Sequence, residues 1–158
     1  MRTPSRHLTA AAIFLLYGGV IAAAAAEDQG RSEPDQALIS SYESIRQAFR
    51  LRQVSPLSPI LPGAGKVYLS VKMITSEPGY YSRDQMEALL RQAFSTIQTV
   101  RFHINIDLDS AGRAERSVAV CPAIWSYTSK GVRGDLNLRF LLNKQQDRWM
   151  LAEIRETR

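Results

Sequence analysis

The sequence predicts an α+β fold in which helices cover one face of a curved antiparallel sheet. Three observations carry this prediction. Two stretches repeat apolar residues at helical spacing, four later stretches alternate apolar and polar residues, and short polar turns join those four stretches. Strands that follow one another through short turns pair as antiparallel neighbours. The 158 residues, 45% of them hydrophobic, suffice for one domain with a buried core.

The chain begins with a segment that has the pattern of an export signal. Arg2 and Arg6 precede an apolar run from Leu8 to Ala26, and alanines stand one and three positions before Glu27. A charged start, an apolar middle and a small-residue end are typical of a secretory signal peptide cleaved after residue 26. The apolar run is also about long enough to span a bilayer, so an uncleaved membrane anchor is the alternative.

The predicted organisation follows from this pattern. Residues 1–26 form a signal peptide or anchor, residues 27–34 a flexible lead-in, and residues 35–158 a single α+β domain. The expected location is the periplasm or the outside of the cell.

The domain is predicted to start as helix, stiff loop and strand. The residues Leu38, Tyr42, Ile45 and Phe49 recur at helical spacing after Asp35 and predict a helix that ends near Gln53. The stretch VSPLSPILPGAG holds three prolines and two glycines, which predicts a wrapped loop. From Lys66 the apolar spacing changes to two, which predicts a strand with one buried face.

A turn at Pro78 and Gly79 then leads through two tyrosines into a second helix. Ser82 and Gln85 have the pattern of a reciprocal cap at the helix start. Tyr81, directly before the cap, is expected to pack on the first turns as a hydrophobic staple, which leaves Tyr80 partly exposed. One apolar stripe follows along the helix: Met86, Leu89, Leu90, Ala93, Phe94 and Ile97.

Four long strands are predicted at residues 100–108, 116–127, 135–143 and 148–156, with a bend at Pro122. Their positions expected to face the helices are all apolar: Phe102, Ile104, Ile106, Leu136, Leu138, Phe140, Trp149 and Leu151. The polar residues that alternate with the first of these are expected to point outward: His103, Asn105 and Asp107.

The order of elements, the helix YYSRDQMEALLRQAF and the terminal strand RWMLAEIRE resemble the nuclear transport factor 2-like superfamily, in particular its small exported bacterial members. The resemblance covers roughly residues 35–155 and rests on element order and patterning. It implies a cone-shaped fold whose mouth is a ligand pocket or active site in some members. For isomerase- and dehydratase-like members it implies an acidic or histidine base on the inward face, with a tyrosine as hydrogen-bond donor.

Five residues are candidates for a site in such a fold. Glu153 is the acidic residue in phase with the apolar positions of the last strand, near the point where the cone would open. Tyr80, Tyr81, Trp125 and Tyr127 combine an apolar ring with a polar atom, which suits a pocket rim, a protein contact or plain packing. An arginine-paired strand end is the structural alternative for Glu153.

Composition limits the chemistry that we expect. Cys121 has no second cysteine to pair with, and His103 is the one histidine outside the leader, so no redox pair, metal site or cofactor is predicted. The net charge of +5 falls to +3 if Arg2 and Arg6 leave with the signal peptide. The basic residues are scattered along the chain, which argues against nucleic-acid binding.

Two classes of function remain. The first is an exported, non-catalytic domain that binds an unknown protein or a small apolar ligand, or has a structural role, and the apolar inner face favours it. Two copies that pair through the outer sheet face would be one such contact. The second is a small isomerase- or dehydratase-like enzyme, which requires an empty cone pocket lined by Glu153 and a tyrosine.

Export predicts that the mature protein begins near Glu27 and is found outside the cytoplasm. Intact-mass measurement on native material should show a chain without residues 1–26. In a matched variant, Ala24→Trp, the bulky side chain should block cleavage and preserve the full mass. A soluble cytosolic protein that retains residues 1–26 would contradict the prediction.

Overall fold

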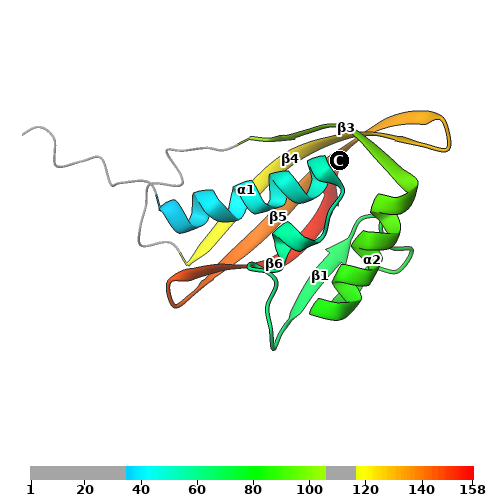
Figure 1. The fold of residues 1–158 in the computed structure, drawn as a ribbon. Helices are drawn as coiled ribbons and strands as arrows, with labels where there is room; N and C mark the ends of the chain where they lie inside the picture. Colours follow the sequence, from blue (N-terminus) through cyan, green and yellow to red (C-terminus); the bar gives the residue numbers. More distant parts are fainter. Residues whose placement is uncertain (1–34, 106–116) are drawn as a thin grey trace, which may run out of the picture. The chain divides into compact units, whose positions relative to one another are not determined.

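The computed structural model describes residues 35–105 and 117–158, which form two α-helices and a six-stranded, curled and unclosed sheet (Figure 1). The elements are α1 (Gln36–Leu51), the 3-10 turn η1 (Ser55–Leu57), β1 (Lys66–Ser70), β2 (Gly79–Ser82), α2 (Arg83–Thr96), β3 (Ile97–Ile104), β4 (Val118–Ser129), β5 (Val132–Gln145) and β6 (Arg148–Thr157). The predicted α+β class is confirmed. No helix in the described ranges is long and apolar enough to cross a bilayer.

The strand order is β2-β1-β6-β5-β4-β3. The four strands β3 to β6 pair as antiparallel neighbours, as predicted. At the turn between β4 and β5, Lys130 and Gly131 both have positive φ, of 50° and 78°, a conformation whose twist matches that of a hairpin. The pairing of β1 with β6 is parallel, and it joins the first strand to the last.

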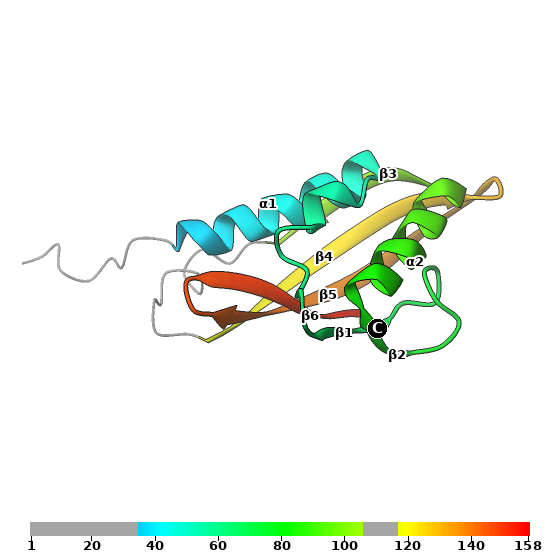
Figure 2. The same cartoon turned by 60° about the horizontal axis from the view of Figure 1, so that its bottom comes forward.

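Both helices lie on the same side of the sheet, as Figures 1 and 2 show from two directions. Phe49 of α1 is fully buried between them and the strands. Its ring centroid lies 4.6 to 5.5 Å from the centroids of four other rings: Phe94 of α2, Phe102 of β3, Trp125 of β4 and Phe140 of β5. One side chain therefore joins both helices to three strands.

The inner face of the sheet is apolar, as the alternation predicts. Six of the eight predicted positions are buried: Phe102, Ile104, Leu138, Phe140, Trp149 and Leu151. Leu136 is partly buried and packs against them, while Ile106 lies outside the described residues, as does Asp107. His103 is exposed, as its position in the strand predicts.

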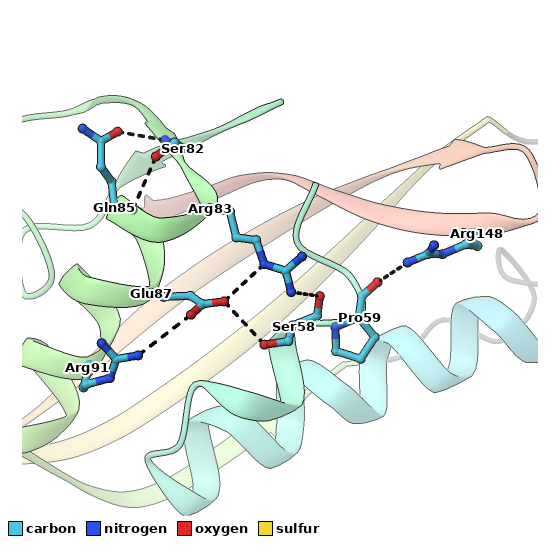
Figure 3. Close-up of polar contacts among 8 residues, drawn as sticks. All are labelled: Ser58, Pro59, Ser82, Arg83, Gln85, Glu87, Arg91 and Arg148. Atoms are coloured by element: carbon cyan, nitrogen blue, oxygen red, sulfur yellow. Dashed lines mark hydrogen bonds and ion pairs between the residues drawn. The ribbon is translucent and has the colours of Figure 1, made fainter. Parts of the chain in front are cut away.

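The segment before α2 differs from the prediction. The turn expected at Gly79 is the start of a short edge strand, β2, in which Tyr80 pairs with Tyr68 and Tyr81 with Val67 of β1. Four residues are too few for alternation to reveal a strand, so the sequence pattern did not indicate it. The predicted cap is confirmed, because Ser82 and Gln85 exchange hydrogen bonds of 2.9 and 3.4 Å (Figure 3).

The proline-rich loop before β1 is held by polar contacts from α2 and β6 (Figure 3). Arg83 donates to the carbonyl oxygen of Ser58 at 2.8 Å, and Arg148 donates to that of Pro59 at 2.9 Å. Glu87 accepts from the Ser58 hydroxyl and pairs with Arg83 at 3.3 Å. These contacts keep three apolar loop residues in the core: Leu57, Ile60 and Leu61.

Asp35 fixes the start of α1 to the β5–β6 hairpin. One carboxylate oxygen accepts from the Leu38 amide at 3.1 Å, and the other accepts from Lys144 Nζ at 3.0 Å and Trp149 Nε1 at 2.9 Å. Burial by itself would raise the pKa of Asp35. The hydrogen bonds from Trp149, Lys144 and Leu38, with the charge of Lys144, outweigh that effect and hold the pKa below its ordinary value of 3.8.

Replacing Phe49 with alanine should lower the free energy of unfolding by about 3–5 kcal/mol, because it removes a fully buried ring from the centre of the core. Leu51→Ala is the matched control on the same helix, since this side chain is 57% exposed, and should change stability by less than about 0.5 kcal/mol. Chemical denaturation measures both. Equal effects of the two changes would contradict this packing.

Asp35→Asn should lower stability at pH 7 by about 1 kcal/mol, because it weakens charge-assisted hydrogen bonds to Lys144 and Trp149. A depressed pKa in the folded state means that the contribution is present above pH 3.8 and is lost as the pH falls through the folded value. The difference between wild type and variant in urea denaturation should therefore shrink in strong acid. Asp147→Asn, at an exposed turn, is the matched control and should change stability at pH 7 by less than about 0.5 kcal/mol.

Candidate functional site

The candidate site lies on the face of the sheet that points away from α1 and α2, here called the open face (Figure 2). Large apolar side chains are exposed on it, although an outward sheet face is usually polar. They are Tyr80 of β2, which is 68% exposed, and three residues of β4: Val118 at 45%, Val120 at 51% and Ile124 at 39%. The three β4 residues are called the aliphatic strip.

Strand register brings Tyr80, Tyr68 and Glu153 into one row. Tyr68 of β1 is the neighbour of Tyr80 on one side and of Glu153 of β6 on the other. The two tyrosine rings meet edge to face at 5.2 Å, and the guanidinium of Arg155 lies 5.2 Å from the centroid of the Tyr68 ring. This is the geometry of a cation–π contact.

Glu153 is the charged centre of this group. Its carboxylate accepts from Arg139 of β5 at 2.7 Å and from Arg155 at 3.2 Å. The Glu153 side chain is only 13% exposed, whereas the arginines are 40% and 43% exposed. The Nε atoms of both arginines are buried and have no hydrogen-bond partner among the described residues.

One carboxylate balances one of the two guanidinium charges, so the group presents one net positive charge beside two aromatic rings. Its five residues are called the Tyr–Arg cluster: Tyr68, Tyr80, Arg139, Glu153 and Arg155. The arrangement can hold a partner's aromatic or carboxylate group by stacking and by hydrogen bonds from the exposed guanidinium nitrogens.

The predicted inward orientation of Glu153 is wrong because of a β-bulge. Two consecutive residues of β5 pair with Leu151 and with Glu153, so Ala152 is an extra residue in β6. An extra residue reverses the alternation beyond it. Ile154, which is fully buried, takes the inward position, and Glu153 turns to the open face.

Trp125, predicted as part of a recognition surface, lies instead in the core. Its side chain is 0% exposed and its indole nitrogen donates to the Thr99 hydroxyl at 3.0 Å. Trp125 shares the inward phase of the buried β4 residues, so a partner at the surface does not reach it. The phase was visible in the alternation of β4, but the polar indole nitrogen suggested a rim.

Tyr81 and Tyr127 stand apart from the Tyr–Arg cluster. Tyr81 packs against the core, and its hydroxyl contacts the Thr75 hydroxyl and the Glu77 carbonyl oxygen. Tyr127 is also partly buried and packs over Gly134, where an added Cβ would lie 2.6 Å from the tyrosine hydroxyl. Of the five predicted residues, Tyr80 and Glu153 lie in one row, on either side of Tyr68. The rings of Trp125 and Tyr127 also lie close together, with centroids 5.7 Å apart, but away from the cluster.

Three members of the cluster were missed from the sequence: Tyr68, Arg139 and Arg155. Tyr68 and Arg139 occupy outward positions by simple alternation, and that signal was available. Arg155 shares the phase of Glu153, so alternation predicts it inward, and it faces outward because of the bulge at Ala152. What the sequence lacks is the parallel pairing of β1 with β6, which places Tyr68 beside residues far along the chain.

Cys121 is buried, and burial raises the pKa of its thiol to about 12, so the thiolate needed for nucleophilic chemistry is not formed at neutral pH. Within the two described ranges, no three His, Cys, Asp or Glu side chains gather as metal ligands.

Aromatic and aliphatic side chains fill the space between helices and sheet. Phe49, Trp125 and Phe140 are fully buried there. Described residues line one cleft of about 430 Å³ at the ends of β3, β4 and β5, and another of about 480 Å³ beside Lys72 and Glu156. Neither cleft combines Glu153 with a tyrosine, which is the lining that an isomerase-like site requires.

No family model matches this sequence, and no curated protein is similar enough to count as a relative. Solved structures do match. A designed protein of the nuclear transport factor 2 type aligns with a TM-score of 0.53 at 9% identity, over 78% of this chain and 97% of that chain. This chain has a nuclear transport factor 2-like fold.

Two natural proteins share the nuclear transport factor 2-like fold with this chain. A DUF4783 family protein from Bacteroides uniformis aligns with a TM-score of 0.52 at 18% identity, over 73% of this chain and 94% of its own. A putative isomerase from Rhodopseudomonas palustris aligns with a TM-score of 0.53 at 15% identity, over 76% of this chain and 87% of the isomerase chain. At these identities the likeness concerns the fold and carries no activity across.

Proposed function

We propose that this chain is an exported, non-catalytic binding domain that contacts a protein through the open face. We propose further that the protein it contacts is a second copy of the same chain. The observation that carries the proposal is the exposed Tyr80, whose ring meets that of Tyr68 edge to face beside Arg155. Tyrosine and arginine are enriched in protein interfaces because they bury a large area and also form hydrogen bonds.

The aliphatic strip supplies an apolar centre for such a contact. Exposed β-branched side chains on one strand, with polar and aromatic groups around them, match the usual arrangement of apolar core and polar rim. Burying these side chains against another protein would remove them from water, at a gain of roughly 25 cal/mol per Å² of apolar surface.

Strand register places the charges of the Tyr–Arg cluster beside the aliphatic strip. Arg139 of β5 is the direct neighbour of Pro122, which lies within the strip on β4, and Arg155 of β6 follows Arg139 in the same row. The backbones of the two arginines therefore lie one and two strand spacings, roughly 5 and 10 Å, from that of the strip. When two copies place strip against strip about a twofold axis, Glu153 neutralises one of the two charges in each copy, and salt screens the repulsion between the remaining ones.

The isomerase-like alternative has less support. It needs a base beside a pocket inside the fold, but Glu153 lies on the open face and is paired with two arginines. Rings around Phe49 occupy the interior. No observation on the described residues favours catalysis over binding.

Sedimentation equilibrium of the mature protein tests the proposal. The wild type should self-associate with rising concentration, whereas Val120→Asp should be monomeric, because it buries an unpaired charge at the centre of the contact. Tyr80→Ala should weaken association while its stability stays within about 0.5 kcal/mol of wild type. Leu51→Ala removes an exposed apolar side chain from α1 and should leave association unchanged.

Two results would count against the proposal. A wild type that stays monomeric at all accessible concentrations would reject the second copy as partner. Tyr81→Ala should lower stability by about 1–3 kcal/mol, because this side chain packs against the core. A thermal melt in which Tyr80→Ala is the more damaging change would contradict the placement of both tyrosines.

A further inference from the structure

A cleft of about 430 Å³ lies at the end of the sheet near the β4–β5 turn and is bounded by β3, β4 and β5. A β-bulge accompanies it: the register of β3 shifts at Val100, after which Arg101 pairs with Ser126. A bulged strand bends away from regular pairing, which hollows the sheet locally. Val100 is 50% exposed and gives the cleft an apolar wall.

Three of the lining side chains form one row across the strands. Arg101 of β3 is the neighbour of Ser126 of β4, which is in turn the neighbour of Asp135 of β5. Two strand spacings, about 10 Å, separate the backbones of Arg101 and Asp135. Arg133 stands two residues before Asp135 and also lines the cleft. The cleft thus has cations, a hydroxyl and an anion in one hollow.

The charged groups of this cleft are not paired with one another. Among the ion pairs of the described residues, none includes Arg101, Arg133 or Asp135. Opposite charges on a sheet face usually pair directly across neighbouring strands. Ser126 lies between Arg101 and Asp135 in the register, so the two are not directly opposite each other. Both charges are therefore available to a ligand that carries their complements.

We propose that this cleft binds a small amino carboxylate zwitterion, either a free amino acid or a dipeptide. The ligand carboxylate accepts hydrogen bonds from the guanidinium of Arg101, with Arg133 adding positive charge, and the ligand ammonium group donates to Asp135. Ser126 offers a hydroxyl between the two. The volume lies in the range of small-molecule sites, and Val100 favours an aliphatic ligand side chain.

Titration of the isotope-labelled protein, followed by amide NMR shifts, tests the proposal with L-leucine and leucylglycine as probes. At least one should bind at the β3–β5 end, and the tighter of the two identifies the ligand class. N-acetyl-L-leucine lacks the ammonium and L-leucinamide lacks the carboxylate, so each should bind at least about tenfold more weakly than L-leucine. Equal binding of L-leucine and its acetylated form would overturn the proposal, as would no binding of either probe.

Variants locate the site. Arg101→Gln and Asp135→Asn should each weaken zwitterion binding by about tenfold or more, because each loses one charge-assisted contact. Arg50→Gln and Asp147→Asn make the same chemical changes at exposed positions outside the cleft and should bind like the wild type. Controls that weaken binding as much as the cleft variants would overturn the assignment. Tyr80→Ala should bind the zwitterion as the wild type does, although it should weaken self-association. The zwitterion proposal and the self-association proposal can therefore be rejected independently of each other.

Discussion

The burial of Phe49 is the constraint on which the rest of the structure depends. Its ring lies within 5.5 Å of rings from α2 and from three strands. The backbone around it is held as well, because the Thr99 hydroxyl donates to the Phe49 carbonyl oxygen at 2.8 Å and accepts from the Trp125 indole at 3.0 Å. If Phe49 were displaced, it would leave a cavity and also unpaired polar groups. The two defects together would lower the stability of the fold more than one of them alone.

This core also decides where recognition can occur. Large aromatic rings around Phe49 pack between the helices and the sheet, and the Tyr–Arg cluster stands on the opposite side of the sheet. Two β-bulges shape that side. The bulge at Ala152 turns Glu153 outward to join Arg139 and Arg155, and the bulge at Val100 accompanies the cleft beside Arg101. Each bulge is one extra residue, yet each changes which side chains a partner meets.

The charged groups are arranged differently in the Tyr–Arg cluster and in the cleft beside Arg101. In the Tyr–Arg cluster, the carboxylate of Glu153 contacts both guanidinium groups directly, which suits a broad contact in which aromatic area dominates. In the cleft, Arg101 and Asp135 stand on either side of Ser126 in the register, and neither forms an ion pair with a described residue. A small ligand that carries matching charges can form charge-assisted hydrogen bonds with these unpaired groups.

Local patterns in the sequence were enough for the helices, the cap at Ser82, the apolar inner face and the order of the four long strands, because each of these depends on residues close together in the chain. The position of Glu153 and the grouping of Tyr68 with Arg155 were not predictable in this way. A parallel pairing of the first strand with the last, and an extra residue in a regular alternation, leave no local signal. They arise from the pairing of strands that lie far apart in the chain, β1 with β6 and β5 with β6, and this pairing is a property of the tertiary structure.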